Sequence, residues 1–468
     1  MEGEVMSVAA TKAAPARLRR FKPYSSYKDS GFEWLGGIPT HWKIAPVYAR
    51  YEVALGKMLD AKRVTGEFSG RYLRNVDVQW DAVNTEGLPE MDFAPSERDR
   101  YLLRRNDLLI CEGGEVGRTA IWRGDGADCF YQKAIHRVRP RSEKEFPRFF
   151  YYLMHMLAKR GVFVAGGNPN TIDHLTAEQL RHYRLPFAPP NEQPAIATFL
   201  DQETARIDAL VAKKERLIEL LQEERMALIT RAVTKGLDPK VPMKDSDVAW
   251  LAEIPAHWEV RRIRHVVKRI EQGWSPDCEN READDYEWGV LKAGCVNRGL
   301  FLEFEHKALP STLEPIHQLE IREGDLLMSR ASGSRELVGS VAVVPKCRPR
   351  LLLCDKLFRL HVDPREGYKR FLAYAMNSRV ARSQIEVVVS GGSGLANNIA
   401  QDVVKNLLLP YPAENEQRAI VAFIERETAR IDALVAKVHD GIQRLHELRN
   451  ALISSAVTGK IDVREKVA

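Results

Sequence analysis

The sequence has 468 residues, of which 29% are charged and 44% hydrophobic, and its formal net charge at pH 7 is +6. This length predicts about two to four domains, each large enough to bury a core. No apolar run approaches the roughly 18 residues that a membrane helix requires, and no signal peptide is recognisable, so we expect a cytoplasmic protein and no membrane partner. The cysteines form no CxxC pair and no zinc-like cluster with histidine, so we expect neither a disulfide framework nor a bound metal.

A segment in the middle of the chain recurs near its end. Residues 191–238 align with residues 415–462 without a gap, at a constant offset of 224, and 28 of the 48 positions are identical. Within this stretch, the run from Glu203 to Lys213 reappears letter for letter as Glu427 to Lys437. Self-similarity at a fixed spacing is the signature of a duplicated unit, so the chain divides into two halves.

The duplication extends upstream, where it is fainter. Asp29-Ser30, Trp34-Leu35, Ile38-Pro39 and His41-Trp42 return 216 residues later as Asp245-Ser246, Trp250-Leu251, Ile254-Pro255 and His257-Trp258. Beyond these anchors only short echoes remain, such as Gly166-Gly167 against Gly391-Gly392, at offsets that wander up to 225. Each half is therefore a divergent body followed by a closely matched helix. We expect a basic, flexible tail (1–26), a first body (27–190), a helical segment (191–238), a second body (239–413) and a second helical segment (414–468).

Each repeated segment is predicted to form one long amphipathic helix. Asn191 is a good N-cap after Pro189-Pro190, and Gly236 and Gly459 mark the helix ends. The apolar stripe needs a partner helix, and the other copy is the obvious one. The residues expected to pair are Ile207, Leu210, Leu217, Leu221 and Leu228 in the first copy and Ile431, Leu434, Ile442, Leu445 and Leu452 in the second. Antiparallel pairing predicts a rod of roughly 45 Å with a body at each end. Alternatively, each helix packs on its own body.

The bodies are predicted to be mixed α/β. Short β-rich runs alternate with glycine-containing loops, and matched runs occur in both halves. They are 107–111, 119–122 and 134–138 in the first body and 325–328, 340–344 and 356–360 in the second. Helical stretches are expected near 149–160 and 368–382. The predicted fold is thus two globular α/β bodies joined by two long repeated helices that form an antiparallel, pseudo-twofold symmetric coiled coil.

Basic residues are the candidates for contact with nucleic acid. Arg137, Arg139 and Arg141 follow one another at a spacing of two, which predicts three guanidinium groups on one face of a strand, although Pro140 weakens the strand there. That face is the best local candidate for contacting a duplex. Further candidates are Arg71, Arg74 and Lys133 in the first body and Lys292, Arg330, Lys356 and Arg359 in the second. For any single cluster, a solvated charged surface is an equally good interpretation.

Catalytic signatures are largely absent. The sequence contains no phosphate-binding GxxxxGK[ST] loop, no GxSxG elbow and no HExxH zinc helix. The Asn/Asp-Pro-Pro-aromatic site of amino-methyltransferases is missing too, because Ala188 precedes Pro189-Pro190. One near match, at residues 276–277 and 305–307, has the residue types of a nuclease that uses Mg²⁺ and a lysine-supported water. The first half has no equivalent, so a self-sufficient nuclease is kept only as an alternative.

The doubled order of motifs resembles the DNA-specificity subunit of type I restriction-modification systems. The resemblance rests on the Asp-Ser-(x)3-Trp-Leu-(x)2-Ile-Pro-x-His-Trp motif that begins at Asp29, on the Asp-Leu-Leu strand at Asp107, and on Asn191-Glu192-Gln193 followed by the Thr-Ala-Arg-Ile-Asp-Ala-Leu helix. It covers nearly the whole chain apart from the tail, and it includes both copies of each motif.

The resemblance implies a division of labour between subunits. Each body would be a target-recognition domain that reads one part of a bipartite, asymmetric site in double-stranded DNA, and the helices would be a spacer that docks two methyltransferase subunits. Restriction subunits with motor and nuclease domains would bind the resulting complex. The resemblance implies a non-catalytic chain without a cofactor, whose bacterial or archaeal partners use S-adenosylmethionine, ATP and Mg²⁺. A coiled-coil scaffold without DNA preference is the second alternative.

Overall fold

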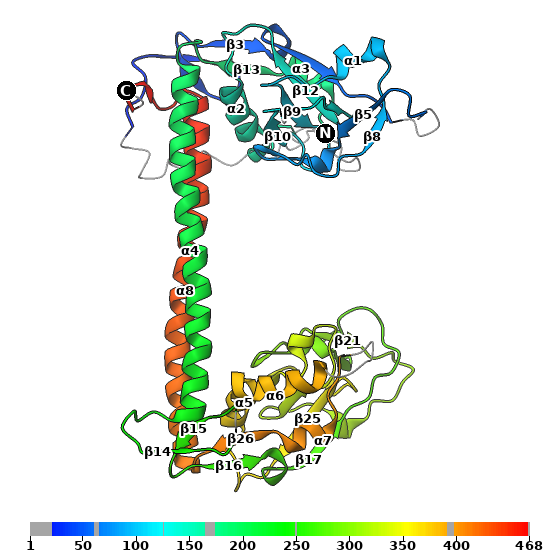
Figure 1. Cartoon of the computed structure of the whole chain (residues 1–468), viewed down its shortest axis with the longest axis vertical. Coiled ribbons are helices and arrows are strands. Elements are labelled where there is room, and N and C mark those ends of the chain that lie inside the picture. Colours follow the sequence, from blue (N-terminus) through cyan, green and yellow to red (C-terminus); the bar gives the residue numbers. More distant parts are fainter. Residues whose placement is uncertain are drawn as a thin grey trace, which may run out of the picture. The chain divides into compact units, whose positions relative to one another are not determined.

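The computed structural model describes residues 21–59, 65–124, 126–163, 174–248, 250–390 and 397–466. The chain divides into two compact units: unit 1 comprises residues 1–214 and 440–468, and unit 2 comprises residues 215–439. We call residues 21–190 body 1 and residues 239–413 body 2. Two long helices, α4 (Gln193–Lys235) and α8 (Glu414–Val457), each contribute one part to each unit (Figure 1). Residues 1–20 of the predicted tail and both Gly-Gly pairs lie outside the described residues.

Body 1 is built on a four-stranded antiparallel sheet in the order β10-β9-β12-β4. Its strands are β4 (Tyr51–Leu55), β9 (Leu108–Cys111), β10 (Thr119–Ile121) and β12 (Ile135–Pro140). All of β9 is buried, because both faces of the sheet are covered. Leu108 and Ile110 pack in the core that includes helix α2 (Pro147–Lys159), whereas Leu109 and Cys111 pack in a second core on the other face. This alternation follows from the two-residue period of a strand.

Smaller sheets extend body 1: β5, β6 and β11 contribute to the second core, whereas β2 and β13 contribute to the core that includes α2. A three-stranded sheet has the order β11-β5-β8, and two-stranded ladders pair β13 with β3, β1 with β2, and β6 with β7. The bounds are β1 (Tyr27–Asp29), β2 (Gly37–Pro39), β3 (Lys43–Pro46), β5 (Ser69–Leu73), β6 (Val78–Gln79), β7 (Ala82–Val83), β8 (Glu90–Asp92), α1 (Pro95–Tyr101), β11 (Phe130–Tyr131), α3 (Ala177–His182) and β13 (Arg184–Phe187).

Body 2 repeats this plan strand for strand. Its main sheet has the order β23-β22-β25-β17, and its second sheet has the order β24-β18-β21. The bounds are β14 (Met243–Asp245), β15 (Glu253–Pro255), β16 (Glu259–Arg262), β17 (Val267–Gln272), β18 (Gly289–Leu291), β19 (Val296–Asn297), β20 (Leu300–Phe301), β21 (His306–Ala308), β22 (Leu326–Ser329), β23 (Val341–Val343), β24 (Leu351–Leu352), β25 (Leu357–Val362), α5 (Lys369–Asn377), α6 (Arg379–Ser390), α7 (Gln401–Asn406) and β26 (Leu408–Tyr411). The mixed α/β class and both long helices are confirmed.

Two local predictions differ from the structure. The single helix expected near 368–382 is two helices, because Ser378 between α5 and α6 has extended dihedral angles. The tail expected to be flexible through residue 26 is packed from Phe21 onward, since the Phe21 ring meets Phe199 edge-on at 5.4 Å and Tyr24 is 4% exposed. Gly236 and Gly459 do follow the helix ends, and both have a left-handed φ that suits glycine.

Within each unit, the local parts of α4 and α8 pack against each other. In unit 1, Ile207 shares a core with Leu445 and Leu452, and Arg449 pairs with Asp208 at 3.2 Å. In unit 2, the equivalent pair is Arg225 with Asp432 at 2.5 Å. Each acidic residue and each arginine of these pairs is related to its counterpart by the offset of 224. No described helix is long and apolar enough to cross a membrane.

The predicted pairing residues divide into two groups. Ile207, Leu221, Ile431, Leu445 and Leu452 are buried, and Leu228 and Ile442 are partly buried against the cores. Leu210, Leu217 and Leu434 are 40%, 43% and 49% exposed, and Leu210 lines a groove together with Leu445 and Leu452 of α8. At 100° per residue, Leu210 and Leu217 lie about 60–80° away from Ile207 around the helix, whereas Val211 and Ile218 lie within about 40° of it and are buried.

Candidate nucleic-acid interface

Body 1 is fixed to the start of α4 by one buried carboxylate. Glu192, which is 4% exposed, accepts hydrogen bonds from Trp42 Nε1 and Tyr24 Oη, both at 3.1 Å, and its other oxygen lies 2.8 Å from His41 Nε2. Arg464, which follows α8, reaches the same carboxylate at 3.4 Å. We call this group the Glu192 cluster. It joins the His-Trp motif to the Asn-Glu-Gln motif, 150 residues apart in sequence.

Unit 2 contains the same attachment. Glu416 accepts a hydrogen bond from Trp258 Nε1 at 2.9 Å and lies 2.9 Å from His257 Nε2. The next residue of the motif also repeats its role, because Gln193 accepts a bond from the Phe146 amide and Gln417 accepts one from the Tyr368 amide. The repeated motifs therefore hold each body on its helices, which explains their repetition without any contact to a ligand.

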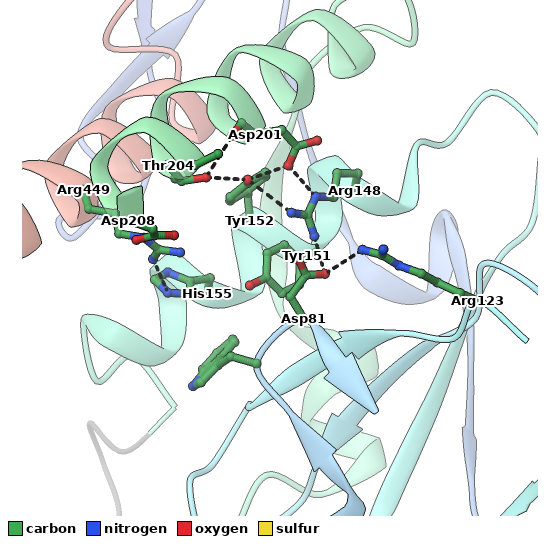
Figure 2. A pocket seen from close by; sticks show the side chains of 12 residues that line it. Asp81, Arg123, Arg148, Tyr151, Tyr152, His155, Asp201, Thr204, Asp208 and Arg449 are labelled. Atoms are coloured by element: carbon green, nitrogen blue, oxygen red, sulfur yellow. Dashed lines mark hydrogen bonds and ion pairs between the residues drawn. The ribbon is translucent and has the colours of Figure 1, made fainter. Parts of the chain in front are cut away.

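A polar cavity lies in unit 1 beside this attachment. Its volume is about 680 Å³, and residues of the β6–β7 turn, α2, α4 and α8 line it. Arg148 of α2 is its central group. The guanidinium pairs with Asp81 and, at 2.7 Å, with Asp201 of α4, and it lies over the rings of Tyr151 and Tyr152 at 4.5 and 4.9 Å. Figure 2 shows Arg148 between the two aspartates. The β6–β7 turn is thereby tied to α4 through α2.

The neighbouring histidine is held neutral in this cavity. His155 is 5% exposed, and Arg449 Nη1 lies 3.3 Å from its Nε2. Burial, together with the charges of Arg449 and Lys159, lowers the pKa of His155 to about 4. The Trp80 ring meets His155 edge-on at 4.9 Å and donates from Nε1 to Glu115 at 2.9 Å. The turn residue Trp80 is thus also folded back onto the helices.

Unit 2 has the equivalent framework without the link to the turn. Arg370 of α5 pairs with Glu425 at 2.7 Å, as Arg148 does with Asp201, but its side chain is 54% exposed. Asn377 stands in the place of His155, and it bonds to Val341 of β23 through both its side-chain atoms. Arg298 and Gly299 stand in the place of Trp80 and Asp81. The Arg298 side chain pairs instead with Glu336 at 2.6 Å, and both are largely exposed.

The arginines predicted to form one face of β12 bind partners within body 1. Arg137 is 2% exposed, pairs with Glu52 of β4 and donates to the Arg100 carbonyl, while Arg139 binds both oxygens of the buried Asp107. In body 2, Arg359 pairs with Glu271 and Asp325 in the same way. Arg137 and Arg359 therefore stabilise the sheet. The prediction that they contact DNA was wrong, because both guanidinium groups are buried and paired with acidic residues. Arg141 lies beyond the strand and donates to the Tyr48 carbonyl.

The other predicted basic residues are scattered over both bodies. Arg74 forms a bidentate pair with Asp77, and Arg71 donates to the carbonyls of Ala127 and Asp128. Arg330 lies over the Phe358 ring and donates to the Asp355 carbonyl. Lys292 lies 3.8 Å from Glu305. Lys133 and Lys356 are exposed at matching turns before β12 and β25, and Arg141 is exposed as well. The structure does not gather these ten residues into one site.

The near match to a nuclease site does not form a metal centre. His306 is 3% exposed and bonds to the Ala283 amide and the Glu303 carbonyl, so it serves the local loop. Across the described ranges, no group of three or more His, Cys, Asp or Glu residues is placed to hold a metal ion.

The two bodies share one fold, and equivalent contacts attach them to equivalent helix ends. They differ at the turns of residues 80–81 and 298–299, so they define a class of protein that presents two different surfaces on a duplicated support. A family model described as the type I restriction modification DNA specificity domain matches residues 83–220. The chain is 28% identical over 242 residues to the EcoEI specificity subunit of Escherichia coli, an alignment that covers 52% of this chain and 40% of that subunit. It is 23% identical to the StySPI specificity subunit of Salmonella potsdam over 91% of this chain and 90% of that one.

One chain of a solved structure has the same fold. That structure was described as the basis for complex assembly and conformational transition of the type I R-M system. Its matching chain has a TM-score of 0.64 at 17% identity, over 90% of this chain and 98% of that chain. In sequence and in fold the chain is therefore similar to the DNA-specificity subunits of type I restriction-modification systems, which are the non-catalytic members of these systems. This similarity gives no support to a self-sufficient nuclease.

Proposed function

We propose that this chain selects the DNA on which a type I restriction-modification complex acts, and that each body reads one part of a bipartite, asymmetric site. The proposal rests on one contrast: the two bodies are attached to the helices in the same way, but their turns carry different side chains. The Glu192 and Glu416 clusters are equivalent, whereas the turns at residues 80–81 and 298–299 differ in charge, size and partners. Equivalent supports with different exposed chemistry suit two half-sites of different sequence.

The helices supply the spacing in this proposal, as a pseudo-twofold antiparallel coiled coil. Thirty residues span roughly 45 Å, and one turn of B-DNA spans roughly 34–36 Å. In such a coiled coil residues 436–442 would face residues 215–221, so deleting both segments would keep the helix pairing and shorten the coiled coil by about 10 Å. We expect the gap between the half-sites to shrink by about three base pairs. An unchanged gap would exclude the helices as the spacer.

The helices also carry matching surfaces for a repeated partner. Leu210 and Leu434, which helix pairing leaves 40% and 49% exposed, lie at the same position of the identical run. Two identical exposed surfaces suit two copies of one protein, and we assign them to two methyltransferase subunits that use S-adenosylmethionine. Restriction subunits that use ATP and Mg²⁺ would join this complex. Leu210→Glu and Leu434→Glu should each remove one methyltransferase copy, as measured by native mass spectrometry, and the double variant should remove both.

Mapping methylated adenines tests the function directly. Cells that express the methyltransferase with this chain should methylate one bipartite motif, and cells that express the methyltransferase alone should not. Methylation that is independent of this chain, or spread over unrelated sequences, would support the scaffold alternative instead.

A further inference from the structure

The β19–β20 hairpin of body 2 has a rigid base and an exposed tip. Val296 pairs with Phe301, Asn297 pairs with Leu300, and the hairpin packs on β22 and β23. Cys295 and Val296 are fully buried, and the Leu302 amide donates to the Cys295 carbonyl at 2.8 Å. Side chains at the tip are therefore presented by a fixed platform, which is what precise recognition requires.

Arg298 occupies a turn position that does not suit it. Its φ is 46° and that of Gly299 is 95°, so both turn residues are left-handed, as in the two-residue hairpin turns that favour Asn-Gly. A non-glycine residue without special side-chain chemistry is strained there, and such strain is concentrated at functional sites. An arginine at this position needs a reason other than the stability of the turn.

The ion pair of Arg298 does not supply that reason. The side chains of Arg298 and Glu336 are 67% and 74% exposed, and exposed pairs of this kind add little stability. Arg382 donates to the Glu336 carbonyl at 2.9 Å, which adds a second guanidinium to the same surface. Glu336 thus shields a cationic tip in the free protein and is easily displaced by a stronger acceptor.

We propose that Arg298 is a base-reading residue of body 2, and that the tip of the β19–β20 hairpin enters a DNA groove at one half-site. The planar guanidinium matches the paired acceptors O6 and N7 of guanine, and the adjacent Leu300, which is 62% exposed, suits a thymine methyl group. The proposal rests on the proposed function and names one of its specificity-determining residues. In body 1, Arg148 and His155 hold the equivalent Trp80 and Asp81 against the helices, so body 1 reads its half-site through other residues.

The test uses the complex of the full chain with its methyltransferase and a DNA library with both half-sites randomised. Arg298→Asn is the informative variant, because asparagine tolerates the left-handed turn. We expect the variant to unfold at an equal or higher temperature. Its preference at one base pair of one half-site should fall by about tenfold to a hundredfold, while the other half-site is unchanged. Arg365→Ala, which removes an 82% exposed arginine of body 2 near Asp363, is the matched control and should leave both preferences intact.

Two outcomes would overturn the assignment. Equal weakening on every sequence, with a smaller dependence on salt, would make Arg298 a phosphate contact. Unchanged preference and affinity would show that the tip does not touch DNA. If the unmodified complex shows no sequence preference, the proposed function itself fails, and that result is distinct from both.

Discussion

Arg148 in unit 1 and Arg370 in unit 2 occupy equivalent positions on α2 and α5, yet Arg148 pairs with two acidic residues and Arg370 with one. Arg148 is 19% exposed and joins Asp81 of a hairpin turn to Asp201 of α4. Arg370 is half exposed and reaches only Glu425 of α8. The helical attachment was therefore retained in both halves, while the turn was fixed to it in one half and left free in the other. In this way a duplicated support allows the exposed elements to diverge.

The largest effect is expected where the two halves agree most. Glu192→Ala leaves the buried donors Trp42 Nε1 and Tyr24 Oη without an acceptor and should destabilise unit 1 by about 4 kcal/mol, since each unpaired buried group costs about 1–3 kcal/mol. Glu416→Ala should cost unit 2 about 2 kcal/mol, because Glu416 is 27% exposed and accepts fewer bonds. Hydrogen exchange measured separately for α2 and α5 peptides checks both values. Equal losses in the two units would contradict the difference in burial.

Breaking the arginine bridges addresses the comparison directly. Arg148→Ala leaves Asp81 and Asp201 without their shared cation in a partly exposed site, and we expect a loss of about 2 kcal/mol in unit 1. Arg370→Ala removes one exposed ion pair and should cost about 0.5 kcal/mol. Urea titration followed by hydrogen exchange in each unit measures the pair. The comparison fails if Arg370→Ala is as damaging as Arg148→Ala.

A pH titration sharpens the comparison, because His155 has the uncharged Asn377 as its counterpart. Burial first, then Arg449 and Lys159, lowers the pKa of His155 to about 4, below the ordinary value of about 6.5. Protonation therefore favours the unfolded form, and stability that is fully present above pH 6.5 is lost as the pH falls toward 4. Unit 1 should lose about 2 kcal/mol between pH 8 and pH 5 from this group.

His155→Asn should remove that loss without changing the pH dependence of unit 2. Arg449→Gln should raise the pKa of His155 toward its ordinary value, because the nearby guanidinium charge opposes protonation. NMR titration of the imidazole measures the second effect. A pH dependence that persists in His155→Asn would assign the loss to other groups.

The smallest effect concerns the two equivalent pairs between the helices. Arg225→Ala removes a solvent-exposed pair with Asp432 and should cost about 0.5 kcal/mol. Arg449→Ala should cost slightly more, because Arg449 is 22% exposed and also lies 3.3 Å from His155. Thermal unfolding at low and high salt checks the pair, and the Arg225→Ala effect should shrink at high salt.

The repeat predicted the architecture because it reports on packing that both halves share. The strands at 107–111 and 325–328, both long helices and their glycine ends follow from local pattern alone. The roles of Arg137 and Arg359 do not, because spacing along one strand says nothing about Glu52 and Glu271 on neighbouring strands. Leu210 and Leu434 stay partly exposed because a three-four spacing covers a wider arc than one partner helix can bury.

The candidate site was the least predictable part. Arg148 pairs with Asp81, which is 67 positions away in the sequence, and with Asp201, which is 53 positions away. Neither separation leaves a periodic signal in the sequence. The Arg298-Gly299 turn did carry a signal, since a glycine in a short break between two apolar runs indicates a hairpin, but its exposed arginine is a single residue among many cations. Sequence-specific recognition depends on such single residues, and the two halves have different residues at this turn.

The contacts around Gly459 have a consequence for connectivity. In unit 2, the chain passes from α4 through Gly236 directly into β14, the first strand of body 2. In unit 1, the chain that follows α8 meets the chain around β1 through noncovalent contacts, among them hydrogen bonds from Tyr27 Oη to the Gly459 carbonyl at 3.0 Å and from the Asp462 amide to the Lys22 carbonyl at 2.8 Å. Noncovalent bonds therefore do in one half what a peptide link does in the other. The arrangement is cyclic although the chain is linear, so a permuted chain that starts at residue 239 and runs through residue 466 into residues 21–238 should reach the same native contacts.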